Sequence, residues 1–277
     1  MRSDYAHVQK HGLQVYSHDG DFTLSPAQLN VYDDAQRMPR VDLVIVTLKT
    51  TANDSFEPLI CPLLHETTAI LTLQNGLGSD QQLAELFGAQ RVLAGLAFIC
   101  TNRAEAGVIR HTDHGFIKLG EFAERRLSER ATALAAMLQQ AKVPATAIAD
   151  IRVGQWEKLV WNVPFNGLGA ALDAETDRLL ATEPGRQIVR KLMHEVIATA
   201  ASVGVALPAA TAQLQIERTA SMGAYVSSMQ VDRRAGRPLE REAIVGRVLA
   251  TAEKAGIDVP ALRWLNDLLA IVDRPAK

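Results

Sequence analysis

One stretch of the sequence carries a lysine and two asparagines at a spacing that could support catalysis. The segment reads WEKLVWNVPFN, and it places Lys158, Asn162 and Asn166 four residues apart. On a helix, residues four apart lie on one face, so these side chains form a polar stripe on an otherwise apolar element. An ammonium group can donate a proton, and two amides can orient a polar ligand. A solvent-exposed face is the alternative, but asparagine is a poor residue for a helix interior, which favours a functional stripe.

A second candidate segment reads SSMQVDRRAGRPLE and spans residues 227–240. It combines two hydroxyls, a basic cluster, a Gly/Pro break and an acid at the start of an expected helix. This composition is compatible with a loop that binds an anionic ligand. It is equally compatible with a charged surface turn whose acid lies at a helix N-terminus.

A third candidate is the glycine-rich turn QNGLG, residues 74–78, which follows the apolar run TAILTL. A strand, a glycine-rich turn and a helix in succession allow the backbone to approach a ligand at the carboxyl end of a parallel sheet. A tight turn needs glycine in any case. The segment also lacks the third glycine of a dinucleotide-binding fingerprint, so the pattern alone is weak.

The elements that must position these residues begin with a predicted parallel sheet. DLVIVTL (42–48) and TAILTL (68–73) are short β-branched runs without alternation, typical of strands buried on both faces. Between them, residues 55–65 carry apolar side chains at helical spacing around Pro62, which predicts a short or kinked crossover helix. RVLAGLAFIC (91–100) is a further strand, and residues 108–119 are expected to form a hairpin that closes this domain.

Beyond residue 127 the pattern is helical. Apolar residues recur at a helical period, and Gly/Pro breakers separate predicted helices at 128–141, 156–172, 184–203, 209–220, 240–255 and 260–272. We therefore predict a Rossmann-like α/β domain over residues 1–125 and an all-α domain over residues 126–277. A cleft between two such domains is a common position for a cofactor site.

Composition excludes several classes of protein. The formal net charge is −2 over 277 residues, so no excess of positive charge attracts nucleic acid. The polar N-terminus and the lack of a long apolar run argue against export and against a membrane protein. Cys61 and Cys100 are the only cysteines, and we expect both to be reduced and buried in a cytoplasmic protein. Metal ligands do not cluster in the sequence, so we expect no metal.

Taken together and in this order, the segments resemble the ketopantoate reductase family, whose members reduce 2-dehydropantoate to pantoate with NADPH. The resemblance runs from Arg2 to about Leu262. LVIVTLK resembles a strand with a cofactor-binding lysine, which implies Lys49. LTLQNGLG implies that Asn75 contacts both cofactor and substrate. RVLAGLAFICTNRAEAGVIRH places Thr101 beside the cofactor.

The remaining two motifs carry the chemistry that the resemblance implies. WEKLVWNVPFN resembles the most specific motif of the family, in which the lysine is the proton donor and two asparagines hold the substrate. This assigns Lys158 as the catalytic residue and Asn162 and Asn166 as substrate ligands. SSMQVDRRAGRPLE carries a substrate-binding serine onto Ser228. It also carries an acid that contacts the cofactor or the substrate hydroxyl onto Glu240.

The sequence departs from the family at its N-terminus. Family members begin with a strand, a GxGxxG turn, a helix and a second strand, and only then reach a segment like RSDYAHVQKHGLQV, which here starts at Arg2. Arg2 corresponds to the arginine that favours the 2′-phosphate of NADP. We therefore expect a truncated parallel sheet with an unpaired edge beside DLVIVTL, weak NADPH binding, and a homodimer that covers this edge.

The resemblance implies a small 2-oxoacid substrate, ketopantoate by default. A reductase of another 2-oxoacid and a truncated, non-enzymatic homologue are the two alternatives.

Overall fold

The structure is a computed structural model that describes residues 3–273, and it divides into two compact units. The first contains the chain up to Val46 together with Asp54–Leu73 and Leu83–Ala149. The second contains Thr47–Asn53, Gln74–Gln82 and the chain from Asp150 onward. Two segments from the part of the chain predicted as α/β, residues 47–53 and 74–82, thus belong to the helical unit.

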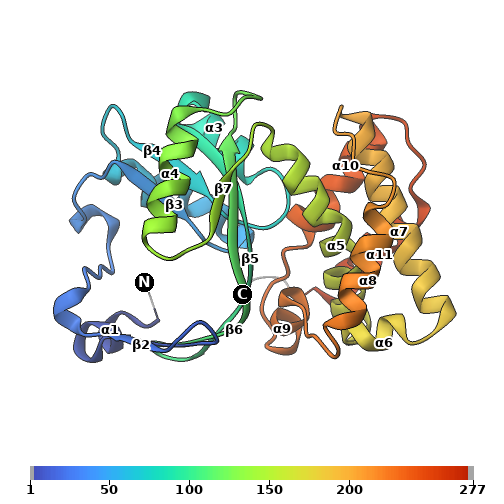
Figure 1. Ribbon diagram of the computed structural model, residues 1–277, viewed down its shortest axis with the longest axis horizontal. Coiled ribbons are helices and arrows are strands. Elements are labelled where there is room, and N and C mark those ends of the chain that lie inside the picture. The colour runs from blue at the N-terminus through green and yellow to red at the C-terminus, as the bar shows by residue number, and fades with distance from the viewer. Residues whose placement is uncertain (1–2, 274–277) are drawn as a thin grey trace. The chain divides into compact units, whose positions relative to one another are not determined.

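The first unit is built on a seven-stranded sheet in the order β2-β1-β6-β5-β4-β3, with β7 added on β6. Strands β3, β4 and β5 run parallel, whereas β5 and β6 form a long antiparallel hairpin (Figure 1). The strands are β1 (Leu13–Ser17), β2 (Phe22–Leu24), β3 (Leu43–Val46), β4 (Ala69–Thr72), β5 (Val92–Glu105), β6 (Val108–Glu121) and β7 (Ala145–Ala147). The sheet is therefore mixed, and its parallel part contains the strands predicted from the apolar runs.

The sheet carries an apolar core on each face. Along β4, Ile70 packs with Phe56 on one face, while Ala69 and Leu71 pack with Ala131 on the other. The helices of this part of the chain are α1 (Tyr5–His11), α2 (Phe56–Ile60), α3 (Ser79–Phe87) and α4 (Glu129–Gln140). The short α2, followed by a 3-10 turn at Cys61–Leu63, matches the kinked crossover helix expected around Pro62.

Two expectations for this region, the burial of β3 and the burial of Cys61, differ from the structure. The β3 strand is not buried on both faces, because it lies at the end of the sheet order and Ile45 is 41% exposed. Cys61 is exposed rather than buried, because it begins a surface 3-10 turn, whereas Cys100 is buried. The compact unit that contains the sheet extends to Ala149, because β7 pairs with β6 and joins this segment to the sheet.

The second unit is helical and is arranged around α5 (Ile151–Leu172), which packs against α7, α9 and α11. Its core includes Phe165 and Leu168 of α5 together with Leu192, Met193 and Leu262 from neighbouring helices. The other helices are α6 (Thr176–Leu180), α7 (Glu183–Ser202), α8 (Thr211–Ser221), α9 (Ser228–Arg234), a π-helical turn (Glu242–Gly246), α10 (Arg247–Lys254) and α11 (Pro260–Val272). The short α6 and α9 lie in segments where the sequence predicted no helix.

Within the part of the chain that the structure describes, no helix combines the length and apolar character that a membrane span requires.

Candidate active site

The polar stripe predicted on residues 158–166 lies on α5. Asp150 caps this helix by accepting a hydrogen bond from the Arg152 N–H, so α5 begins several residues earlier than predicted. Asn162 and Asn166 are only 3% and 2% exposed. A solvated surface is therefore excluded as an explanation for the two asparagines. A buried amide without a partner destabilises the fold, so such a stripe needs polar groups to meet it.

Lys158 contacts the glycine-rich turn. Its Nζ donates a hydrogen bond of 2.6 Å to Oδ1 of Asn75. Burial of the ammonium group lowers the pKa of Lys158 to about 8, although the negative charge of Glu240 acts in the opposite direction. A lysine with this pKa can hold a proton at neutral pH and release it more readily than an exposed lysine.

The glycine-rich turn is held by the π-helical turn Glu242–Gly246. Gly76 has a φ of 81°, and a Cβ at this position would lie 2.4 Å from the carbonyl oxygen of Ala243. The N–H of Leu77 donates to the same oxygen at 2.9 Å. Glycine is thus required here by protein backbone rather than by a ligand. The consequence is that Asn75 is fixed opposite Lys158.

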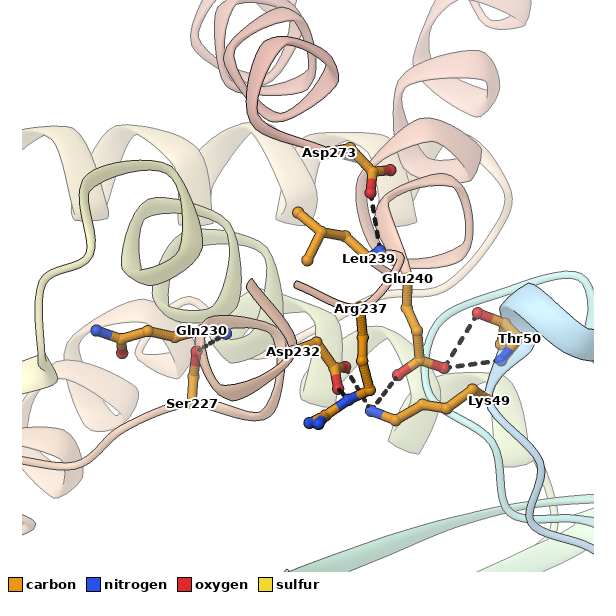
Figure 2. A network of polar contacts seen from close by, with 9 residues as sticks. All are labelled: Lys49, Thr50, Ser227, Gln230, Asp232, Arg237, Leu239, Glu240 and Asp273. Atoms are coloured by element: carbon orange, nitrogen blue, oxygen red, sulfur yellow. Dashed lines mark hydrogen bonds and ion pairs between the residues drawn. The ribbon is translucent and has the colours of Figure 1, made fainter. Parts of the chain in front are cut away.

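A second set of contacts surrounds Glu240, which is 4% exposed. Its Oε1 accepts hydrogen bonds from the Thr50 N–H at 2.9 Å and from the Thr50 hydroxyl at 3.0 Å. Its Oε2 accepts from Lys49 Nζ at 3.2 Å (Figure 2). The predicted acid is therefore engaged with the loop that carries the predicted cofactor-binding lysine.

Lys49 is held by two carboxylates. Besides Glu240, Oδ2 of Asp232 accepts from Lys49 Nζ at 2.8 Å, and Asp232 is only 2% exposed. Partial burial acts to lower the pKa of Lys49, but the charges and hydrogen bonds of Glu240 and Asp232 prevail and raise this pKa above its usual value. Lys49 therefore stays protonated throughout the physiological range.

The segment between Asp232 and Glu240 is anchored at both ends. Oδ1 of Asp232 accepts from Arg237 Nε at 2.9 Å, and the N–H of Leu239 donates to Oδ1 of Asp273 at 2.9 Å (Figure 2). These contacts fix the backbone immediately before Glu240. The carboxylate is thereby positioned without a regular α-helix around it.

The α9 helix brings the serine pair against α5. Ser227 is the N-cap and accepts from the Gln230 N–H, and a Cβ at Gly169 of α5 would lie 3.2 Å from Ser227 Oγ. Ser228, the next residue, is partly buried, and within the described residues its hydroxyl has no hydrogen-bond partner. The serine that the resemblance selected is therefore the one whose hydroxyl is available to a ligand.

Two buried side-chain oxygens near these elements also have no hydrogen-bond partner among the described residues. They are Oδ1 of Asn166 and Oε1 of Gln230. An unsatisfied buried polar atom costs about 1–3 kcal/mol. Such a cost is expected where a ligand supplies the missing partner. The two orphaned oxygens lie on α5 and α9.

The second unit thus brings together most of the residues predicted to form the site. Lys158 contacts Asn75, and Glu240 contacts Lys49, while Thr101 lies exposed on β5 in the first unit and Arg2 lies outside the described residues. Sequence reasoning assigned no role to Thr50, Asp232 or Gln230. Asp232 and Gln230 lie inside the SSMQVDRRAGRPLE segment, so the motif already pointed to the region in which they are found.

Comparison with known proteins adds independent evidence. Residues 1–124 match the family described as ketopantoate reductase PanE/ApbA, and residues 150–273 match its C-terminal counterpart. The chain is 40% identical to a 2-dehydropantoate 2-reductase of Nostoc sp. over 99% of this chain and 86% of that protein.

Two solved structures carry the same name. The 2-dehydropantoate 2-reductase from Geobacter metallireducens matches with a TM-score of 0.94 and 44% identity, over 98% of this chain and 90% of that one. The enzyme of that name from Methylococcus capsulatus matches with a TM-score of 0.87 and 31% identity, over 98% and 87% of the two chains.

Proposed function

The chain belongs to the ketopantoate reductase family, and we propose that it reduces 2-dehydropantoate to pantoate with NADPH. The observation that carries this proposal is the setting of Lys158. Its ammonium group has a pKa of about 8 and contacts Asn75, on a helix whose next two turns present buried amides. The names of the Nostoc and Geobacter proteins support the choice of substrate.

Reduction of a ketone needs a hydride for the carbon and a proton for the oxygen. Bound NADPH supplies the hydride, a group that no amino-acid side chain provides. Lys158 Nζ supplies the proton as negative charge develops on the ketone oxygen, and its positive charge stabilises that oxygen in the transition state. The second unit fits a reaction in which protein and cofactor share these tasks, because Lys158 is an acid of suitable pKa and the hydride would come from the cofactor.

The substrate is held by polar groups of α5 and α9, among them side-chain atoms that lack hydrogen-bond partners among the described residues. Asn162 and Asn166 orient the polar end of the 2-oxoacid, and the unpaired Oδ1 of Asn166 accepts a hydrogen bond from a substrate hydroxyl. The Ser228 hydroxyl donates to the substrate carboxylate. Because these groups gain hydrogen-bond partners only when substrate binds, the site favours a 2-oxoacid that carries a hydroxyl group.

The cofactor would be held by Lys49, Asn75, Thr101 and Glu240, with Arg2 at the 2′-phosphate as the resemblance implies. Lys49 is suited to an anionic ligand because its charge is permanent and its side chain is 47% exposed. Glu240 also positions Lys49 and Thr50 through its hydrogen bonds. We also propose that the protein acts as a homodimer in the cytoplasm.

Steady-state kinetics test this function. We expect kcat/KM for 2-dehydropantoate to exceed that for 3-methyl-2-oxobutanoate, which lacks the hydroxymethyl group, by about 100-fold or more. NADPH should be preferred over NADH. A higher kcat/KM for 3-methyl-2-oxobutanoate than for 2-dehydropantoate would indicate a reductase of another 2-oxoacid. Absence of turnover, together with absence of NADPH and pantoate binding in calorimetry, would indicate a non-enzymatic homologue.

A further inference from the structure

Two histidines and an aspartate meet in the first unit, on the side of β6 where His111 pairs with Thr101 of β5. His18 and Asp19 directly follow β1, and His111 lies on β6. Parallel pairing of these strands sets Ser17 opposite His111, which brings the three side chains together. One ligand atom of each lies within 4.8 Å of the others, and the two imidazole rings are 4.7 Å apart. We call this group the histidine cluster.

The backbone of β6 bends at the histidine cluster. His114 has a φ of 58° and Gly115 a φ of 139°, and the pairing of β5 with β6 shifts register beside them. A left-handed, non-glycine residue is uncommon and carries strain. Here the carbonyl oxygen of His114 accepts hydrogen bonds from His111 Nε2 at 2.6 Å and from His18 Nε2 at 3.0 Å. These two hydrogen bonds hold the imidazole rings beside each other.

Gly115 lies directly against the histidine cluster. A Cβ built on it would lie 3.1 Å from Cε1 and 3.3 Å from Nε2 of His111, and 4.0 Å from Asp19 Oδ2. The absence of a side chain thus lets the His111 imidazole lie close to the backbone of β6. Imidazole nitrogen and carboxylate oxygen are both ligands that Zn²⁺ accepts.

We propose that His18, Asp19 and His111 bind one divalent transition-metal ion such as Zn²⁺, which would replace the hydrogens that the two imidazoles donate to the His114 carbonyl. Imidazole and carboxylate ligands suit Zn²⁺ and its neighbours in the first transition row, whereas Mg²⁺ and Ca²⁺ prefer oxygen ligands alone. Ser17 Oγ is 2.9 Å from His111 Nδ1 and accepts its N–H once Nε2 binds the metal. The exposed side of the cluster leaves positions for water.

The ion would tie the turn after β1 to the bulge in β6. The role we propose for it is therefore structural. The proposed site differs from the sequence-based expectation of no metal. His18 and His111 are far apart in the chain, and only the register of β1 on β6 brings them together.

Calorimetric titration of Zn²⁺ into the untagged, chelator-treated full chain tests the site. We expect one ion per chain, no response to Mg²⁺, and an unfolding temperature that rises with Zn²⁺ concentration. His18→Ala and His111→Ala should each weaken binding at least tenfold. The control is the variant His7→Ala/His11→Ala, which removes the other adjacent histidine pair, on α1, and should bind Zn²⁺ like the wild type.

A pair of glycine variants separates the metal site from backbone strain. Gly115→Ala would press a methyl group against the His111 ring, while Gly20→Ala places a methyl group at a φ of 121° where no other atom lies within 4 Å. Both variants should lose stability, but only Gly115→Ala should lose Zn²⁺ affinity by tenfold or more. The proposal is overturned by the absence of saturable binding up to millimolar Zn²⁺. Equal affinity in the wild type and the His18→Ala and His111→Ala variants would also overturn it.

Discussion

The two lysines of the candidate active site have opposite environments. Lys158 on α5 contacts a neutral amide at 2.6 Å, and burial lowers its pKa to about 8. Lys49 contacts the carboxylates of Asp232 and Glu240 at 2.8 and 3.2 Å, and its pKa is raised. At Lys158 burial outweighs the charge of Glu240 and yields an acid, whereas at Lys49 two carboxylates in direct contact outweigh partial burial and keep the lysine charged.

The largest effect is expected at Lys158. Lys158→Ala should lower kcat for ketone reduction by about two orders of magnitude or more, because the general acid is lost. NADPH affinity should change little. The matched control is Lys191→Ala, which removes an exposed lysine of α7. Near wild-type turnover in Lys158→Ala would refute the proton-donor role.

The pH dependence of turnover should follow the same group. Because Lys158 must be protonated to act as the acid, kcat should be constant below its pKa of about 8 and fall about tenfold per pH unit above it. Stopped-flow single turnovers would measure the chemical step directly. A profile that stays level to pH 10 would mean that another group supplies the proton.

Removing the unsatisfied amide should separate substrate binding from stability. In Asn166→Leu the orphaned Oδ1 disappears, so the free energy of unfolding should be unchanged or higher, as for apolar replacement of unpaired polar groups. Loss of the substrate contact should raise KM about tenfold, because one lost hydrogen bond costs about 1.4 kcal/mol of binding free energy. Urea unfolding and steady-state kinetics on one preparation would check both. A lower stability with unchanged KM would assign Asn166 a purely structural role.

The smallest effect concerns the charges around Lys49. Asp232→Asn should lower the free energy of unfolding by about 1–2 kcal/mol, less than for a fully buried pair because Lys49 is 47% exposed. Asp33→Asn, which breaks the exposed pair with Arg37, should cost under about 0.5 kcal/mol. An equal decrease in the free energy of unfolding in the two variants would show that burial of Asp232 does not strengthen its ion pair with Lys49.

How far the sequence predicted this structure depends on how far apart the interacting residues lie. The stripe of Lys158, Asn162 and Asn166 followed from helical spacing, which is a local property. The contact of Lys49 with Asp232 joins a loop after β3 to α9, so no local pattern could reveal it. The same holds for β7, a three-residue strand that only its partner β6 defines.

The central claim is that burial makes Lys158, and not Lys49, the proton donor of the site. NMR titration of the protein labelled with ¹³C at the lysine side chains would measure both pKa values, with Lys158→Ala and Lys49→Ala used to assign the signals. We predict a pKa of about 8 for Lys158 and a value above 10.5 for Lys49. Equal values near 10.5 for the two lysines would contradict this account.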